Sequence, residues 1–362
     1  MRKEIYRMPD AEARALLASA PYVHLCGTDD DGRPIARTVH GVVVDGALAF
    51  HAAPAGEKLG LLDRPVVAFT EEMVAEIPSW FVDPERACPA TTYYRAVQVH
   101  GVLETVSEPA HKARVLAALM ARFQPEGRHV PITHDHPLYE KALRGLLVAH
   151  VPLAHLDGKS KLGQNRSAEE RARILELLWQ RGRPGDPRAI ELIRRASPDT
   201  PLPPFLAAPA GLRLSVCLGP GDLDGALALL RGAYWNVGNS DEALRRSHLG
   251  ADAWVGAHDA EGRLVATARA TSDGAKHAWV YDVAVHPAQR GLGVGQAVVR
   301  LLCDHPAVRA AHLTHLYTRD AQAFYGRLGF APPRPPPFER TELVLERAEG
   351  APAAGPIPPS PP

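Results

Sequence analysis

Three glycines, Gly291, Gly293 and Gly295, stand two residues apart between an alternating segment and an apolar one. Residues 280–286 alternate side chains as a pleated strand does, and residues 296–303 can continue as an apolar helix. Backbone N–H groups at a helix N-terminus, together with the helix dipole, suit a phosphate group. The stretch predicts a strand, a phosphate-holding loop and a helix. A glycine-rich turn without a ligand is the alternative.

Two common phosphate loops do not fit this spacing. A dinucleotide loop needs G-x-G-x-x-G, and a triphosphate loop needs a Lys-Ser or Lys-Thr pair, which is missing here. Arg-Gly-x-Gly-x-Gly after a strand instead resembles motif A of the GNAT acetyltransferases, which holds the pyrophosphate of acetyl-CoA. The resemblance implies that backbone groups of seven residues bind this cosubstrate: Val283 and Val285 along the pantetheine arm, and Arg290, Gly291, Gly293, Val294 and Gly295 at the pyrophosphate.

Further segments resemble the same family in the same order over residues 212–345. They are a hairpin over 252–258 and 264–270, a strand over 312–318, and a helix over 320–330 that contains Tyr325. Tyr234-Trp235 followed by Ser240-Asp241-Glu242 is similar to the family's first helical segment. Thr318 stands where many members carry Asn, which we interpret as a variation within the family.

The resemblance implies transfer of an acetyl group to a small-molecule or peptide amine. A free alkylamine has a pKa of roughly 10, so a proton must leave before it attacks. Asp282 is the nearest carboxylate in sequence and is the candidate base, although its side chain could point to the opposite face of the strand. Tyr325 is the candidate acid, since the resemblance places its hydroxyl beside the leaving sulfur. The alternative for Tyr325 is a core aromatic residue.

The composition allows two ordinary domains in 362 residues. Lys and Arg number 41 and Asp and Glu number 41, which argues against a broad nucleic-acid footprint. Four scattered cysteines show no C-x-x-C spacing and are expected to be reduced, and no long apolar run indicates a signal peptide or membrane span. We therefore expect a cytoplasmic protein. The expected divisions are a domain over 1–195, a proline-rich linker over 196–211, a domain over 212–345 and a disordered tail over 346–362.

The N-terminal half is rich in strand patterns. A helix over 10–18 with Asp10 as its N-cap comes first, and a second helix is expected over 108–123. The expected strands cover 22–27, 34–44, 47–52, 66–70, 94–105 and 146–156. A helix over 168–180 follows the basic segment 159–166, which is either a solvated helix start or a flavin contact across a dimer interface.

This order resembles the FMN-binding split barrel of pyridoxamine-phosphate-oxidase-like proteins, with details similar to nitroimidazole-resistance proteins and to the regulator PaiB. The fold class is thus α+β, with a split β-barrel followed by a mixed GNAT sheet. The resemblance implies FMN bound at a homodimer interface by Arg37, Thr38, His51 and Lys58. Lysine and arginine suit a phosphate dianion, although both could simply be solvated.

Several functions stay open at this point. The barrel could be an FMN-dependent oxidoreductase, or a non-catalytic module of PaiB type that senses a flavin or another ligand. His134 and His136 flank Asp135 in a proline-bounded loop, but no third ligand lies at a suitable spacing, so we expect no metal site.

Overall fold

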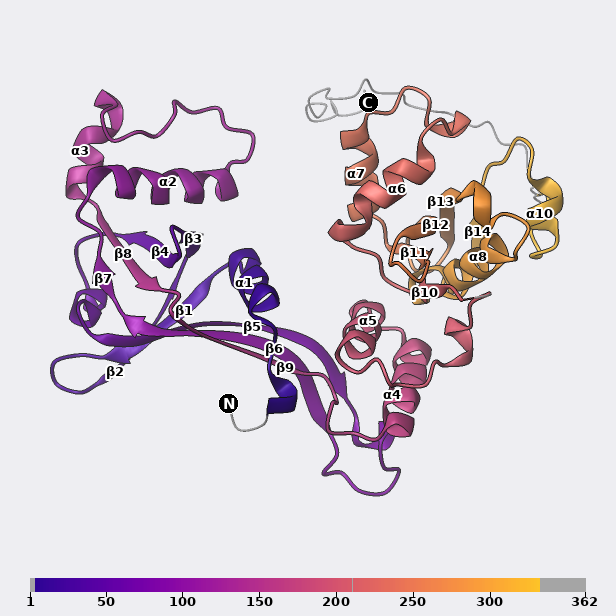
Figure 1. The fold of residues 1–362 in the computed structure, drawn as a ribbon, viewed down its shortest axis with the longest axis horizontal. Coiled ribbons are helices and arrows are strands. Elements are labelled where there is room, and N and C mark those ends of the chain that lie inside the picture. Colours follow the sequence, from indigo (N-terminus) through magenta and orange to yellow (C-terminus); the bar gives the residue numbers. More distant parts are fainter. Residues whose placement is uncertain (1–3, 210, 333–362) are drawn as a thin grey trace, which may run out of the picture. The chain divides into compact units, whose positions relative to one another are not determined.

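The computed structural model describes residues 4–209 and 211–332 (Figure 1). The chain divides into two compact units. The N-terminal unit runs to Leu177 and includes Leu192–Pro201, and the C-terminal unit comprises Leu178–Glu191 and the chain from Leu202 onward. The expected tail, 346–362, and the last part of the expected domain 212–345 lie outside the described residues.

Two antiparallel sheets make up the N-terminal unit. Their strand orders are β2-β1-β5-β6-β9 and β3-β4-β8-β7. The strands are β1 (Val23–Thr28), β2 (Pro34–Val39), β3 (Val42–Val44), β4 (Ala47–Ala52), β5 (Pro65–Ile77), β6 (Thr91–Val102), β7 (Glu104–Thr105), β8 (Leu147–Pro152) and β9 (His155–Lys161). The helices are η1 (Glu4–Tyr6), α1 (Asp10–Ser19), η2 (Glu57–Leu61), η3 (Ser79–Phe81), α2 (Pro109–Phe123) and α3 (Pro137–Gly145).

The core of this unit contains side chains from both sheets. Leu25 and Val97 of the first sheet belong to one buried cluster with Leu48 and Val151 of the second. A separate cluster joins Val115 and other residues of α2 to the four-stranded sheet. Alternating burial along β6 places one set of side chains in the core and leaves the other toward the surface.

Some expected boundaries in this half are wrong. The expected strand 34–44 divides into β2 and β3, which belong to different sheets, and 146–156 divides in the same way into β8 and β9. Near the first break a Cβ at Gly41 would lie 2.8 Å from Leu48 Cδ1 and 3.1 Å from Val23 Cγ2, so a larger residue there would have to displace side chains of both sheets. An alternation pattern reports strand character but does not say where a strand changes sheets.

Two further details differ from expectation. Strand β5 continues to Ile77 rather than ending at residue 70, because residues 71–77 remain paired with β6. Asp10 is the first residue of α1, and Pro9 occupies the N-cap position.

The C-terminal unit contains one mixed sheet. Its order is β10-β11-β12-β13-β14, antiparallel except for the parallel pair β13–β14. The strands are β10 (Arg213–Ser215), β11 (Ala253–His258), β12 (Leu264–Ser272), β13 (His277–Val285) and β14 (Leu313–His315). The helices are η4 (Pro204–Leu206), η5 (Pro220–Asp222), α6 (Leu223–Leu230), η6 (Tyr234–Asn236), α7 (Asp241–Leu249), η7 (Pro287–Gln289), α8 (Val294–Asp304), α9 (Pro306–Arg309) and α10 (Gln322–Gly326).

The α+β fold class is confirmed for both units. The expected hairpin is present as β11 and β12, and Ser240 caps α7 by accepting a hydrogen bond from Ala243 N. The expected strand 312–318 and helix 320–330 are shorter than expected. Helices α6 and α8 both pack against β12 and β13, and the C-terminal end of β13 lines the site.

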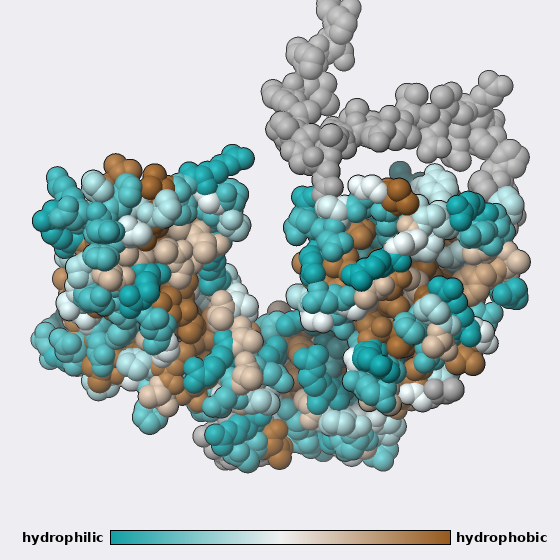
Figure 2. Space-filling model, turned by 45° about the horizontal axis from the view of Figure 1, so that its top comes forward, coloured by the Kyte–Doolittle hydropathy of each residue, from teal (hydrophilic) through white to brown (hydrophobic). Residues whose placement is uncertain are grey.

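Two helices, α4 (Ala168–Arg181) and α5 (Asp186–Ala196), contribute residues to both units. Within the expected linker, Leu206 of η4 is fully buried, and Phe205 stacks on Trp179 with ring centroids 4.7 Å apart. None of the described helices has the length and apolar character needed to cross a membrane. Figure 2 shows hydrophilic residues over much of the visible surface, with hydrophobic residues exposed among them.

Candidate active site

The glycine loop lies between β13 and α8, as the sequence predicts. Gly291 and Gly293 have φ angles of 79° and 81°, which L-residues with a side chain rarely adopt. Gly293 is the N-cap of α8 and accepts the first helical hydrogen bond, from Ala297 N, at 3.0 Å. The loop therefore presents backbone N–H groups at the start of an 11-residue helix.

A pocket of about 850 Å³ opens beside this loop. It brings together all seven residues expected to bind acetyl-CoA and also Tyr325: the lining includes Val283, Val285, Arg290, Gly291, Gly293, Val294, Gly295 and Tyr325. A Cβ at Gly295 would lie 3.4 Å from Val285 Cγ2 and 3.5 Å from the Phe324 ring, in ordinary van der Waals contact, so Gly295 lies between β13 and α10 at the pocket wall.

Tyr325 reaches the pocket from α10, where it is half-buried. Burial raises the pKa of Tyr325 to about 12, and Tyr234 and Cys303 add to the shift. The phenol is consequently neutral at physiological pH and can donate a hydrogen bond into the pocket.

Asp282 does not line this pocket, and its carboxylate is engaged elsewhere. Its Oδ2 accepts a hydrogen bond from Arg269 Nε at 2.6 Å, and its Oδ1 accepts from Trp235 Nε1 at 3.2 Å and Asn236 Nδ2 at 3.1 Å. The expected unbroken alternation along 280–286 is wrong, because β13 bulges at Asp282, whose φ is 53°.

Residues outside the expected catalytic and acetyl-CoA-binding sets also line the pocket. Tyr234 and Trp235 of η6 line one wall, and Arg319 lies on the segment before α10. Arg319 N donates a hydrogen bond to the Tyr234 hydroxyl at 3.0 Å, and its guanidinium lies 3.8 Å from the Tyr234 ring centroid. Adjacent aromatic residues ahead of a capped helix were the available sequence signal for this wall.

The residues expected to bind flavin lie on separate elements of the N-terminal unit. Arg37 of β2 forms an ion pair with Glu57 of η2, and half-buried Lys58 is the next residue of that helix. Thr38 Oγ1 lies 3.3 Å from His24 Nδ1 on the neighbouring strand. Partial burial, followed by the nearby His40, lowers the pKa of His51.

Lys58 therefore lies on the short helix η2, and Arg37 contacts the preceding residue of that helix, Glu57. The Glu57 carboxylate already engages Arg37, which leaves Lys58 as the more available cation. A lysine and an arginine are chemically suited to a flavin phosphate, and the fit depends on Arg37 exchanging Glu57 for that anion.

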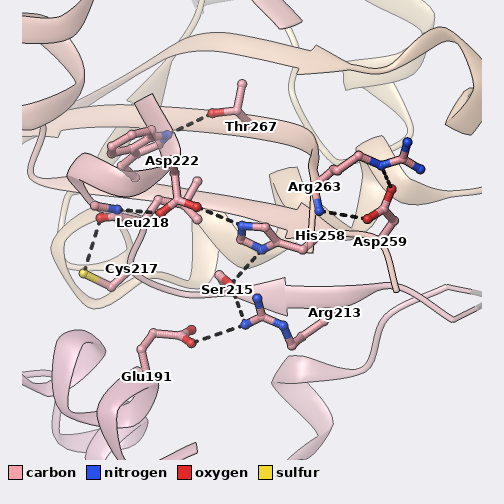
Figure 3. A network of polar contacts seen from close by, with 12 residues as sticks. Glu191, Arg213, Ser215, Cys217, Leu218, Asp222, His258, Asp259, Arg263 and Thr267 are labelled. Atoms are coloured by element: carbon pink, nitrogen blue, oxygen red, sulfur yellow. Dashed lines mark hydrogen bonds and ion pairs between the residues drawn. The ribbon is translucent and has the colours of Figure 1, made fainter. Parts of the chain in front are cut away.

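A second polar arrangement has the residue types of a nucleophilic triad (Figure 3). Ser215 Oγ lies 3.3 Å from His258 Nδ1, and His258 Nε2 lies 2.9 Å from Asp222 Oδ1. Only 3% of Ser215 is exposed, so a substrate carbonyl cannot reach its hydroxyl. The network instead links β10, β11 and η5, since Asp222 also accepts a hydrogen bond from Gly219 N.

In the loop that contains His134 and His136, one histidine has a structural role. His136 caps α3 by accepting a hydrogen bond from Leu138 N at 3.3 Å. Over residues 4–209 and 211–332, no group of three or more His, Cys, Asp or Glu side chains has an arrangement that could hold a metal ion.

Comparisons with known proteins give a different family match for each half of the chain. Residues 9–160 match the family model of pyridoxamine 5′-phosphate oxidase, and residues 227–330 match that of the GNAT acetyltransferases. Serotonin N-acetyltransferase 2, chloroplastic, of Oryza sativa subsp. japonica is 38% identical over 95 residues, covering 25% of this chain and 48% of that protein. An uncharacterized N-acetyltransferase of Pyropia yezoensis is 38% identical over 73 residues, covering 20% of this chain and 42% of that protein.

Among solved structures, a putative GNAT acetyltransferase of Xanthomonas campestris pv. campestris is 29% identical, with a TM-score of 0.31, covering 35% of this chain and 88% of that one. A putative 5-nitroimidazole antibiotic resistance protein of Bacteroides thetaiotaomicron is 16% identical, with a TM-score of 0.35, covering 42% of this chain and 85% of that one. The chain spans less than half the length of the curated relatives it matches. It joins a domain of the pyridoxamine 5′-phosphate oxidase type to a domain of the GNAT acetyltransferase type.

Proposed function

We propose that the C-terminal unit is an acetyl-CoA-dependent N-acetyltransferase that acts on a small-molecule or peptide amine. The observation that carries the proposal is the single pocket in which the glycine loop, the end of β13 and Tyr325 meet. The loop's N–H groups suit the pyrophosphate, and the β13 backbone at Val283 and Val285 suits the amide groups of pantetheine.

In the reaction one proton is transferred, one bond forms and one bond breaks. A neutral amine attacks the thioester carbonyl, a C–N bond forms and the C–S bond breaks, so the amine proton finally resides on the CoA thiol or in solvent. The Tyr325 hydroxyl supports the departing sulfur as a hydrogen-bond donor. Because both Asp282 oxygens are engaged, a water in the pocket is better suited than Asp282 to accept the amine proton.

The test is CoA release from acetyl-CoA in the presence of a panel of amines. The panel should contain arylalkylamines, polyamines, amino acids and short peptides. Arylalkylamines are included because one relative is named a serotonin N-acetyltransferase. Amine-dependent release of CoA would support the proposal. Absence of both acetyl-CoA binding and turnover across the panel would refute it.

We further propose that the N-terminal unit binds FMN through Lys58 and Arg37, with Thr38 and His51 nearby. The support is the position of Lys58 on η2, the ion pair of Arg37 with Glu57 of the same helix, and the match of residues 9–160 to the pyridoxamine 5′-phosphate oxidase family model. FMN would supply electron-transfer chemistry if the domain is catalytic. A flavin- or ligand-sensing regulator of PaiB type, with a non-catalytic N-terminal domain, is the second candidate.

The visible spectrum of the purified protein, followed by titration with FMN, tests this assignment. Lys58→Ala should weaken FMN binding, since it removes the more available cation, whereas Lys141→Ala on exposed α3 should not. Turnover of an electron donor by the yellow protein would favour the oxidoreductase over the sensor. A colourless protein that ignores added FMN would contradict both flavin roles. The proposed homodimer is tested by light scattering with and without FMN.

A further inference from the structure

We infer that Asp282 is a positioning residue, which fixes the acceptor-side wall of the pocket formed by η6 (Tyr234–Asn236). The inference deepens the proposed acetyltransferase function and rests on it for its kinetic test. It assigns Asp282 a role distinct from that of a general base, because the residue acts through Trp235 and Asn236.

The strand geometry turns Asp282 inward. Between the pairs Thr267↔Ala284 and Arg269↔Tyr281, two residues of β13 stand opposite one residue of β12. Such a bulge changes the direction in which the following side chains point. Asp282, at φ 53°, is only 5% exposed, whereas the residues immediately after the bulge, beginning with Val283, line the pocket.

A buried cation keeps the Asp282 carboxylate in place. The exposed fractions of the Arg269 and Asp282 side chains are 12% and 3%, and the two groups are 2.6 Å apart. Removing water from a charge is costly unless a partner compensates for it, so each group requires the other. The pair uses Oδ2 and leaves Oδ1 as an acceptor for neighbouring donors.

That second oxygen holds η6. Trp235 Nε1 and Asn236 Nδ2 both donate to Asp282 Oδ1, and hydrogen bonds to a charged acceptor are stronger than neutral ones. A helix of three residues has too few internal hydrogen bonds to hold its own shape. The position of Trp235 in the pocket wall is therefore set largely by Asp282.

The other side of η6 is attached near the proposed acid. The Tyr234 hydroxyl accepts a hydrogen bond from Arg319 N, and the Tyr234 ring lies beneath the Arg319 guanidinium. Trp235 packs edge-on against Tyr234, with ring centroids 4.9 Å apart. The wall thus connects the β13 bulge to the segment that precedes Tyr325. Because the proposed function places the thioester sulfur beside Tyr325, we assign the approach of the acceptor amine to this part of the pocket.

The kinetic test separates positioning from proton transfer. Trp235→Phe with Asn236→Ala removes both donors and keeps an aromatic ring and the buried ion pair. This double variant should raise the acceptor KM by roughly 10-fold or more. The Kd for acetyl-CoA and the shape of the pH profile should stay as in the wild type. Asp282→Asn should raise the acceptor KM less in this background than in the wild type, because residues acting through one contact are not additive; the unpaired Arg269 charge lowers stability equally in both backgrounds.

The opposite result would identify a base. In that case Asp282→Asn lowers kcat by the same factor in the wild-type and double-variant backgrounds, and activity recovers as the pH rises. An unchanged acceptor KM in the double variant would also overturn the inference. Unchanged acetyl-CoA binding shows that each variant is folded.

A second measurement is independent of turnover. Amide hydrogen exchange should become faster over residues 233–239 in both the Asp282→Asn and the double variants, with the glycine loop 291–297 unchanged. Unchanged exchange over 233–239 would refute the positioning role. If the wild type turns over no amine but the variants still show faster exchange over 233–239, the positioning role stands and only the proposed acetyltransferase function is contradicted.

Discussion

Replacing Tyr325 with phenylalanine tests the proposed acid, because the change removes the hydroxyl and keeps the ring. With a pKa of about 12, the phenol is a much weaker acid than a thiol. Full proton transfer to a departing thiolate would be unfavourable by roughly 3 to 4 pKa units. We therefore expect Tyr325 to donate a hydrogen bond as negative charge develops on sulfur, while the thiol finally takes its proton from elsewhere.

The size of the effect follows from that role. A hydrogen bond to a charged acceptor contributes about 1.5–3 kcal/mol, so Tyr325→Phe should lower kcat by roughly 10- to 150-fold. The thioester sulfur carries no charge before reaction, and hence the Kd for acetyl-CoA should change little. An acetyl thioester with a more acidic thiol should show a smaller loss, because its leaving group needs less stabilisation.

Saturating amine and chromatographic measurement of CoA give kcat, and calorimetry gives the Kd for acetyl-CoA. Tyr317→Phe is the matched control, since Tyr317 is 76% exposed and does not line the pocket. A kcat within twofold of the wild type for Tyr325→Phe would refute the reasoning. A weaker Kd with unchanged kcat would instead make Tyr325 a binding residue.

The remaining predictions concern the C-terminal unit. Gly293→Ala should weaken acetyl-CoA binding measured by calorimetry, because a side chain at φ 81° strains the N-cap of α8. Gly256→Ala should destabilise the unit in a denaturant titration by about 1–3 kcal/mol, since its Cβ would lie 2.5 Å from Ala266 O. Gly219→Ala, with open space around its Cβ, is the control for both; equal effects would contradict them. Burial and then Arg309 lower the pKa of His305 to about 4, so between pH 6.5 and 4 the unfolded chain binds the extra proton. Unfolding free energy should fall over that range by up to about 3 kcal/mol, and His305→Asn, which retains a cap for α9, should reduce this loss.

Local patterns were sufficient for the loop and the hairpin of the C-terminal unit. Gly291 and Gly293 indicate left-handed backbone before a helix, and the turn at 260–262 separates two alternating strands. The divisions of 34–44 and 146–156 between two sheets could not be predicted, because a strand that changes sheets keeps its alternation. The pocket wall at Tyr234 depends on Arg319, 85 residues away, which no local pattern reports.

The bulge at Asp282 illustrates why alternation failed at the site itself. An unbroken strand would avoid a left-handed residue, whose strain costs of order 1–3 kcal/mol. It would also shift every residue after position 282 to the opposite face, since side chains alternate with a period of two. The ion pair with Arg269 and the two donors of η6 offset the strain, because they satisfy a buried carboxylate that would otherwise be unpaired. The same residue therefore influences which part of β13 lines the pocket and where the wall formed by η6 lies, and a local alternation pattern contains neither fact.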